Sequence, residues 1–252
     1  MLTGILVPMP EEIELIISNM TIESIYESGR RNFYKGTLNG YECVVALSRI
    51  GKVASSVTAA IMIEHFGIDR LIVAGVAGAV NTRLKVGDIV VATEATQHDL
   101  DARPLFPQFE APLLNKAIFP CHDTLVCDAV ACCEEFLQKD FQNYIAQEYI
   151  DQFSLHNPRV YSGQICCGDQ FIGSAQQLIR IQNELPNALC VEMEGGAVGQ
   201  ICYEFNIPYI VVRTISDSAN DHAPIDFSKY IENVAKYYTF GIVEKILSKI
   251  NT

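Results

Sequence analysis

The chain has 252 residues, of which 49% are apolar and 19% charged, and this composition excludes a disordered protein. Its 18 Lys and Arg residues stand against 30 Asp and Glu residues, which gives a net charge of −12. A surface of that sign repels phosphate backbones and anionic lipid heads, so nucleic acid and membrane surfaces are disfavoured as partners. A small neutral or cationic ligand fits this charge better.

The nine cysteines are odd in number and irregularly spaced, which argues against a disulfide framework. No C-x-x-C motif occurs, so we expect no metal site, and nothing in the chain calls for a cofactor. Most cysteines lie in apolar runs, as small core residues do, which favours the reducing cytoplasm. The apolar run 1–9 is too short for a signal peptide, and no stretch approaches the ~18 apolar residues of a membrane span.

The first half of the chain predicts strands that alternate with helices. A buried strand is expected over 4–9, and Pro10, Glu11 and Glu12 suit the first turn of the helix that follows. Asn39-Gly40 is typical of a tight hairpin turn. The other expected elements are hairpin strands over 33–38 and 41–47, a helix over 52–66, a strand over 70–74 that ends in the glycine turn 75–78, and a strand over 88–93.

In the second half, residues 99–112 contain three prolines without periodicity and predict a loop. Residues 140–158 are polar and predict an insertion or a helical extension. Helices are expected over 124–139, 174–183, 195–204 and 227–250, and strands over 160–167, 188–193 and 209–215. Because strands alternate with helices, we expect one three-layer α/β/α domain over residues 1–252, with a mixed, mostly parallel central sheet.

Polar or glycine-rich segments follow four of these strands, at 9–12, 75–78, 192–194 and 213–217. Ligands collect at the carboxyl ends of strands in open α/β sheets, so we expect a site there. Taken singly, the acidic residues have ordinary explanations: Glu12 as a solvated first-turn charge, Glu194 as a surface charge, and Asp217 as a turn residue. The constellation is therefore more informative than any member.

Other motifs are weak. The glycines at 75–78 lack the third glycine of a dinucleotide-binding fingerprint, and no G-x-S-x-G nucleophile elbow occurs. His98 and His222 fall in predicted loops, where a histidine contacts a ligand less often than not.

The motifs V-E-M-E at 191–194 and V-R-T-I-S-D at 212–217 resemble the purine nucleoside phosphorylase superfamily, and within it the 5′-methylthioadenosine/S-adenosylhomocysteine nucleosidases. Further matching pieces span nearly the whole chain in the family's order: M-P-E-E at 9–12, I-G-K-V at 50–53, the glycine turn at 75–78, V-G-D-I-V at 86–90, H-D at 98–99 and G-D-Q-F-I at 168–172. The resemblance implies hydrolysis of the N-glycosidic bond of methylthioadenosine, S-adenosylhomocysteine or 5′-deoxyadenosine, with release of adenine.

The resemblance also implies residue roles. Asp217 would be the general acid that protonates purine nitrogen-7, and Glu12, helped by Arg213, would activate the attacking water. Glu194 would hold the ribose hydroxyls beside the Met193 backbone. The remaining implied substrate-binding positions are Phe171 and Ile172 for adenine, Met9, Ile50 and Phe227 for the 5′ group, Ser216 to orient Asp217, and Glu192 and Val76.

Val76 departs from the family pattern, and the residue that closes the 5′ pocket is left open. Val76 stands where these nucleosidases carry a serine, so the placement of the water is in doubt. The family closes the 5′ pocket with an aromatic residue from the second subunit of a homodimer, and here either Leu105 or Phe106 occupies that loop.

Four alternatives stay open. The first turn 10–12 has no arginine and Glu12 would repel phosphate, so hydrolysis is favoured over phosphorolysis. A futalosine-type hydrolase would cleave the same bond with a bulkier 5′ group. A non-catalytic nucleoside-binding protein is supported by Val76, and an interaction protein only by segment 140–158.

Overall fold

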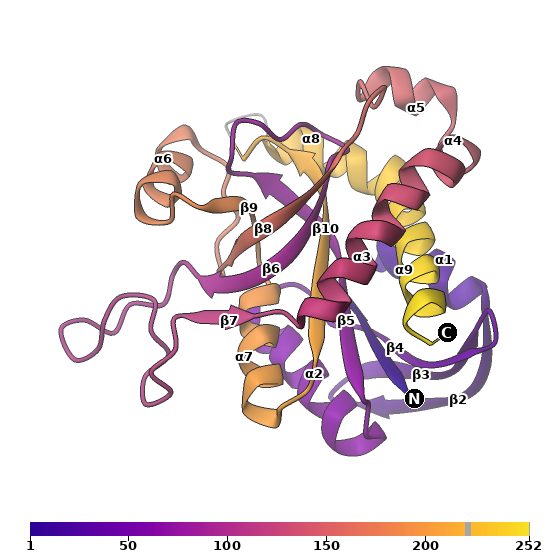
Figure 1. The fold of residues 1–252 in the computed structure, drawn as a ribbon, viewed down its shortest axis with the longest axis horizontal. Helices are drawn as coiled ribbons and strands as arrows, with labels where there is room; N and C mark the ends of the chain where they lie inside the picture. Colours follow the sequence, from indigo (N-terminus) through magenta and orange to yellow (C-terminus); the bar gives the residue numbers. More distant parts are fainter. Residues whose placement is uncertain (220–222, 252) are drawn as a thin grey trace.

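The computed structural model describes residues 1–219 and 223–251, with the side chains of 223–226 left aside. A central sheet is covered on one face by α1, α3 and α9 and on the other by α2 and α7 (Figure 1). The expected three-layer α/β/α fold with a mixed sheet is thereby confirmed. The helices are α1 Pro10–Ser18, α2 Lys52–Phe66, α3 Asp123–Glu135, α4 Phe141–Tyr144, α5 Gln147–Gln152, α6 Ala175–Glu184, α7 Gly195–Phe205, α8 Ala223–Tyr230 and α9 Lys236–Ile250.

The strands form one sheet in the order β10-β6-β8-β9-β5-β1-β4-β3-β2, and β7 pairs with β6. Because β10 also pairs with β5, the first five strands of this order close on themselves. The strands are β1 Thr3–Val7, β2 Met20–Ser28, β3 Arg31–Leu38, β4 Tyr41–Leu47, β5 Arg70–Ala79, β6 Ile89–Gln97, β7 Ile118–Pro120, β8 Val160–Cys167, β9 Ala188–Glu192 and β10 Tyr209–Asp217.

Strand β5 is longer than the sequence predicts, and the expected glycine turn at 75–78 is wrong. These residues continue the strand because they pair in parallel with β10, with Gly75 opposite Arg213 and Gly78 opposite Asp217. A side chain on Gly75 would collide with Arg213 Nη1. The glycines therefore provide room for the side chains of the neighbouring strand rather than a change of direction.

Two strands escape prediction for different reasons. Most of β2 is solvent-exposed and polar, as an edge strand of this sheet, so it lacks an apolar pattern. β7 has only three residues and forms by pairing with β6. The C-terminal helix also differs from prediction, since α8 begins at Ala223 and a π-helical turn, Ile231–Ala235, separates it from α9. No helix among the described residues is long and apolar enough to cross a membrane.

Segment 140–158 packs into the main hydrophobic core. Phe141, Ile145, Ile150 and Leu155 are at most 5% exposed and belong to the same buried cluster as the central strands. Phe141 meets Tyr238 of α9 edge to face, with ring centroids 5.7 Å apart. The segment is thus a helical extension of α3 that covers the end of α9 (Figure 1).

We expect Leu155→Ala to lower the free energy of unfolding by about 2–5 kcal/mol, because Leu155 is 1% exposed and truncation leaves a cavity. The exposed neighbour Gln152 supplies the control Gln152→Ala, which we expect to change stability by less than about 0.5 kcal/mol. Urea denaturation measures both. Equal stability of the two variants would show that segment 140–158 is not part of the cooperative core.

Candidate active site

The carboxyl ends of β1, β4, β5, β9 and β10 surround a cavity of about 330 Å³. Five polar or backbone-contributing positions from the sequence analysis line it: Glu192, Met193, Glu194, Ser216 and Asp217. Six apolar ones line it as well: Met9, Ile50, Val76, Phe171, Ile172 and Phe227. Segments far apart in the chain therefore meet at one site because their strands are neighbours in the sheet.

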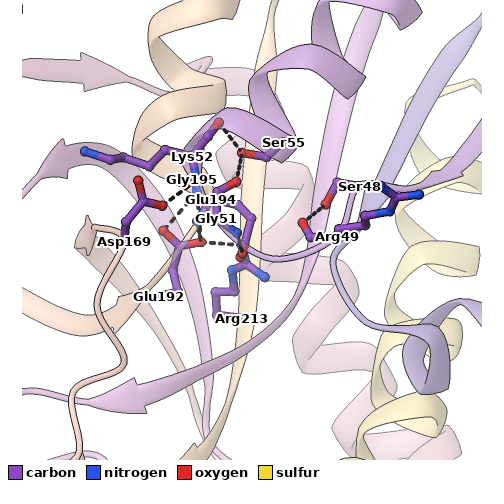
Figure 2. Close-up of polar contacts among 10 residues, drawn as sticks. All are labelled: Ser48, Arg49, Gly51, Lys52, Ser55, Asp169, Glu192, Glu194, Gly195 and Arg213. Carbon is purple, nitrogen blue, oxygen red and sulfur yellow. Dashed lines mark hydrogen bonds and ion pairs between the residues drawn. The ribbon is translucent and has the colours of Figure 1, made fainter. Parts of the chain in front are cut away.

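Arg213 lies at the base of this site and is completely buried. Its Nη2 pairs with Glu192 Oε2 and lies 3.2 Å from Glu194 Oε2 (Figure 2). A buried cation is costly unless it is paired, and two carboxylates provide that pairing here. The V-E-M-E and I-S-D motifs are thus joined by one guanidinium group.

Glu192 and Glu194 are held by backbone donors as well. Both Glu192 oxygens accept hydrogen bonds from the Gly195 N–H, at 2.9 and 2.8 Å, at the start of α7. Glu194 Oε1 accepts a hydrogen bond from the Gly51 N–H at 2.9 Å. Burial raises the pKa of Glu194 to about 7, against the opposing effect of Arg213.

Glu12 is completely buried beside Arg213, behind the cavity wall. A side chain on Gly75 would come within 3.2 Å of Glu12 Oε1, which places this oxygen next to the same glycine that Arg213 approaches. Burial raises the pKa of Glu12 to about 8, although the nearby Arg213 charge lowers it. Neither Glu12 oxygen has a partner of good hydrogen-bond geometry among the described residues, and Glu12 is not among the residues that line the cavity.

Asp217 is 2% exposed and faces the cavity from the end of β10. The Ser216 hydroxyl donates to Asp217 Oδ2 at 2.8 Å, and the Ala219 N–H donates to Oδ1 at 2.8 Å. These two bonds fix the orientation of the carboxyl group. A buried carboxyl group with a fixed orientation at a cavity wall has the geometry of a general acid or base.

The opposite wall is formed by residues 168–172, which follow β8. Phe171 is 44% exposed and meets Phe227 edge to face, with ring centroids 5.6 Å apart. The Asp169 side chain accepts from the Lys52 N–H at 2.8 Å, which ties this wall to the start of α2 (Figure 2). Asp99 adds a second tie, since it accepts from Lys52 Nζ at 2.7 Å and from the Asp169 N–H at 2.8 Å.

Some predicted positions lie elsewhere. Leu105 and Phe106 are in the loop between β6 and β7, which extends away from the sheet, and neither lines the cavity of its own chain (Figure 1). His98 is 3% exposed and is not among the lining residues. His222 lies outside the described residues. The described residues contain no group of three or more His, Cys, Asp or Glu side chains that could hold a metal ion.

Sequence reasoning missed four residues of the site. Gln170 lines the cavity, and Lys52, Asp99 and Asp169 join its walls. The signal that points to them is their place in the H-D, I-G-K-V and G-D-Q-F-I motifs, which were assigned to the family without a role for these side chains. The tertiary structure decides which of these motifs contact one another, and the sequence alone does not show it.

Comparison with known proteins assigns the family. Residues 3–248 match the phosphorylase superfamily. The chain belongs to the phosphorylase superfamily. Within it, a 5′-methylthioadenosine/S-adenosylhomocysteine nucleosidase from Aeromonas salmonicida is 34% identical over 250 residues, which cover 99% of this chain and all of that protein. The resemblance read from the motifs is therefore confirmed.

Solved structures of the superfamily agree. The nucleosidase of the same kind from Neisseria meningitidis, in complex with methylthio-immucillin-A, is 30% identical, with a TM-score of 0.84 and 97% of each chain covered. A futalosine hydrolase from Helicobacter pylori is also 30% identical, with a TM-score of 0.82 and 97% of each chain covered.

The raised pKa of Glu12 predicts a pH-dependent cost to stability. Between the ordinary pKa of 4.5 and the folded value of about 8, the folded chain keeps a proton that the unfolded chain releases. The contribution of Glu12 to stability is therefore complete below pH 4.5 and is lost as the pH rises to about 8. We expect the wild-type chain to lose a few kcal/mol relative to Glu12→Gln across this range, since one pKa unit corresponds to about 1.4 kcal/mol.

Urea denaturation at a series of pH values measures this difference. The exposed Glu14 lies on the same helix, so Glu14→Gln is the control and its stability should follow the wild type at every pH. Parallel curves for Glu12→Gln and the wild type would show that Glu12 ionises normally in the folded chain.

Proposed function

We propose that this chain hydrolyses the N-glycosidic bond of a 5′-modified adenine nucleoside, releasing adenine and the 5′-modified ribose. The observation that carries the proposal is that Glu194 and Asp217 line one cavity, while the buried Arg213 pairs with Glu194 and the buried Glu12 lies beside Arg213 behind the cavity wall. The names of similar proteins support the same reaction, since they include nucleosidases and a hydrolase that act on such compounds.

Asp217 is the proposed general acid. Adenine is a poor leaving group until a ring nitrogen is protonated, and a carboxyl group held by Ser216 and the Ala219 N–H is oriented to deliver that proton to nitrogen-7. The buried location keeps bulk water from competing for the proton.

Glu12 and Arg213 are proposed to activate the attacking water. A Glu12 pKa of about 8 makes the carboxylate a stronger base than an exposed glutamate once it is ionised. The sugar becomes positively charged as adenine departs, and that charge favours the ionised forms of Glu12 and Glu194. The site is thus complementary to the transition state more than to the ground state.

The remaining residues are proposed to bind the parts of the nucleoside. Glu194 and the Met193 backbone would hold the ribose hydroxyls, with Glu192 fixing Arg213. Phe171 offers a ring for adenine, and base–aromatic stacking is worth about 1–3 kcal/mol. Further contacts are proposed from Ile172 to the adenine edge, and from Met9, Ile50, Val76 and Phe227 to the sugar and its 5′ group.

The charge balance of the site supports hydrolysis over phosphorolysis. Arg213 is already paired with Glu192 and Glu194, and the buried Glu12 adjoins it. A phosphate ion would meet several carboxylates and no free cation among the described lining residues, which is unfavourable. Water carries no charge and avoids this repulsion.

We expect Asp217→Asn to lower kcat for adenine release by about 10²–10⁴-fold, because an amide cannot deliver the proton. Nucleoside binding, measured by calorimetry, should remain. The assay uses 5′-methylthioadenosine in phosphate-free buffer, and the exposed Asp151 supplies the control Asp151→Asn, which should release adenine at the wild-type rate.

Three results would contradict the proposal. Full turnover by Asp217→Asn would remove Asp217 as the acid. A wild-type reaction that requires added phosphate would show a phosphorylase, and binding without turnover would show a nucleoside-binding protein on this scaffold. The same assay with futalosine as the substrate tests the second candidate function, a futalosine-type hydrolase. The similarity to the Helicobacter pylori futalosine hydrolase supports this candidate.

We infer that the chain works as a homodimer in the cytoplasm, as a single domain. Apolar side chains are exposed on one face of α2, where Val53 is 76% and Val57 41% exposed. The loop between β6 and β7 exposes Leu105 to 82% and Leu113 to 84%. Contiguous exposed apolar surface favours contact with another chain.

All nine cysteines are free, which supports a reducing compartment such as the cytoplasm. There the reaction would serve nucleoside breakdown and methionine salvage.

We expect Val53→Glu to shift the molar mass from dimer to monomer, because a charge in a buried apolar interface is unfavourable. Light scattering after gel filtration measures the mass. Ile25 on the edge strand β2 is 57% exposed, so Ile25→Glu is a matched control that should leave the mass unchanged. A monomeric wild-type chain, or a dimeric Val53→Glu variant, would contradict this interface.

A further inference from the structure

A second cavity, of about 460 Å³, lies between α1, the turn that joins β2 to β3, and the end of β4. Three arginines, Arg30, Arg31 and Arg49, contribute to its wall. The α1 side chains of Ile13 and Ile17 form an apolar part of the same wall. We call this space the arginine cavity. The chain as a whole carries a charge of −12, so three arginines around one cavity reverse the sign locally.

The positive charges of these arginines are not compensated by ion pairs. Arg31 donates to the carbonyl oxygens of Gly29 at 2.9 Å and of Ser48 at 3.4 Å, and Arg49 donates to the Arg30 carbonyl. Among the described residues none of the three forms an ion pair, although Glu27 also lines the cavity. Burial and the nearby Arg49 charge lower the pKa of Arg31, as expected where cations gather without an anion.

The backbone gives an independent observation. Arg30 has φ 58° and Arg49 has φ 69°, so both occupy the left-handed region. That region is unfavourable for residues with a side chain and is usually filled by glycine, asparagine or aspartate. Gly29 and Arg30 are the two central residues of the tight turn between β2 and β3, and such a turn requires positive φ at both, so the turn accounts for Arg30. Only the backbone strain at Arg49 lacks this explanation, and strain of this kind clusters where a side chain has a binding role.

The arginine cavity adjoins the nucleoside cavity through two short segments. Met9 lines the nucleoside cavity and Pro10 the arginine cavity, while Ile50 lines the first and Arg49 the second. The two segments lie side by side, since β1 and β4 pair in parallel and the Ser48 N–H donates to the Val7 carbonyl at 2.9 Å. Met9 and Ile50 are the residues proposed to line the 5′ group, so the segments that border the arginine cavity also border the 5′ end of the nucleoside cavity.

We propose that the arginine cavity binds a carboxylate at the far end of the substrate's 5′ substituent. Guanidinium groups recognise carboxylates through paired N–H donors, and the apolar wall suits the carbon chain that leads to the charge. The proposal rests on the proposed function and narrows its substrate class to nucleosides whose 5′ tail ends in a carboxylate. The amino-acid tail of S-adenosylhomocysteine carries such a carboxylate beside an ammonium group, and methylthioadenosine has none.

Arg30 and Arg49 are solvent-exposed, so water and salt compete for them and the expected effect is moderate. We expect Arg49→Gln to lower kcat/KM for S-adenosylhomocysteine about tenfold at low ionic strength, with Arg30→Gln acting in the same direction. The rate with methylthioadenosine should stay unchanged, which also shows that the variants fold. The exposed Arg83 lines neither cavity, so Arg83→Gln is the control and should not affect either substrate.

Two further arms make the test specific. Converting the tail carboxylate of S-adenosylhomocysteine to its amide should lower kcat/KM in the wild type and abolish the difference between wild type and Arg49→Gln. Free acetate, at constant ionic strength, should inhibit turnover of the acidic nucleoside without affecting methylthioadenosine.

The outcomes separate the two proposals. The proposal fails if Arg49→Gln and Arg30→Gln have the same kcat/KM as the wild type for S-adenosylhomocysteine, its amide and methylthioadenosine. That result would show that the arginine cavity does not bind the tail. Thermal stabilisation by free acetate that is lost in Arg49→Gln, without any preference for the acidic tail, would also overturn it by showing a site for a separate anion. Absence of adenine release from every nucleoside would instead contradict the proposed function.

Discussion

The buried ion pairs of Arg213 are the interaction on which the rest of the site depends. A guanidinium group without solvent contact costs several kcal/mol unless carboxylates surround it. Glu192 and Glu194 supply that charge, and Glu12 adjoins the same group. Since Glu192 and Glu194 lie at the end of β9, Arg213 lies in β10 and Glu12 lies in α1, these contacts fix the three elements relative to one another. The arginine thus organises the carboxylates as well as neutralising them.

The carboxylates of the site have different environments, and this allows different roles. Glu12 and Glu194 are raised in pKa by burial to about 8 and about 7, while Arg213 opposes the shift in both. Asp217 is held by a hydroxyl group and a backbone N–H at the end of β10. Carboxyl groups held in different environments can take different parts in acid–base catalysis. The difference comes from burial and neighbours rather than from the residue type.

The arginine cavity shows a contrasting use of charge. In the nucleoside cavity a single cation is enclosed by carboxylates, which suits a neutral molecule that becomes positive during reaction. A few residues away, Arg30, Arg31 and Arg49 gather without a paired carboxylate. The ends of β1 and β4 separate these two regions, so a molecule that lies across them meets opposite charges at its two ends. Such a separation selects for the orientation of the substrate as well as its size.

The sequence by itself determined the alternation of strands and helices, because apolar runs and capping residues are local signals. It determined β8 and α2 to the residue, and the family motifs indicated the carboxylates of the site. Only the tertiary structure decided that Gly75–Gly78 continue β5, that β2 forms an edge, and that Lys52, Asp99 and Asp169 join separate walls. It also decided the arginine cavity. The physical reason is that pairing, burial and the shift of a pKa depend on neighbours from distant parts of the chain, which no local pattern records.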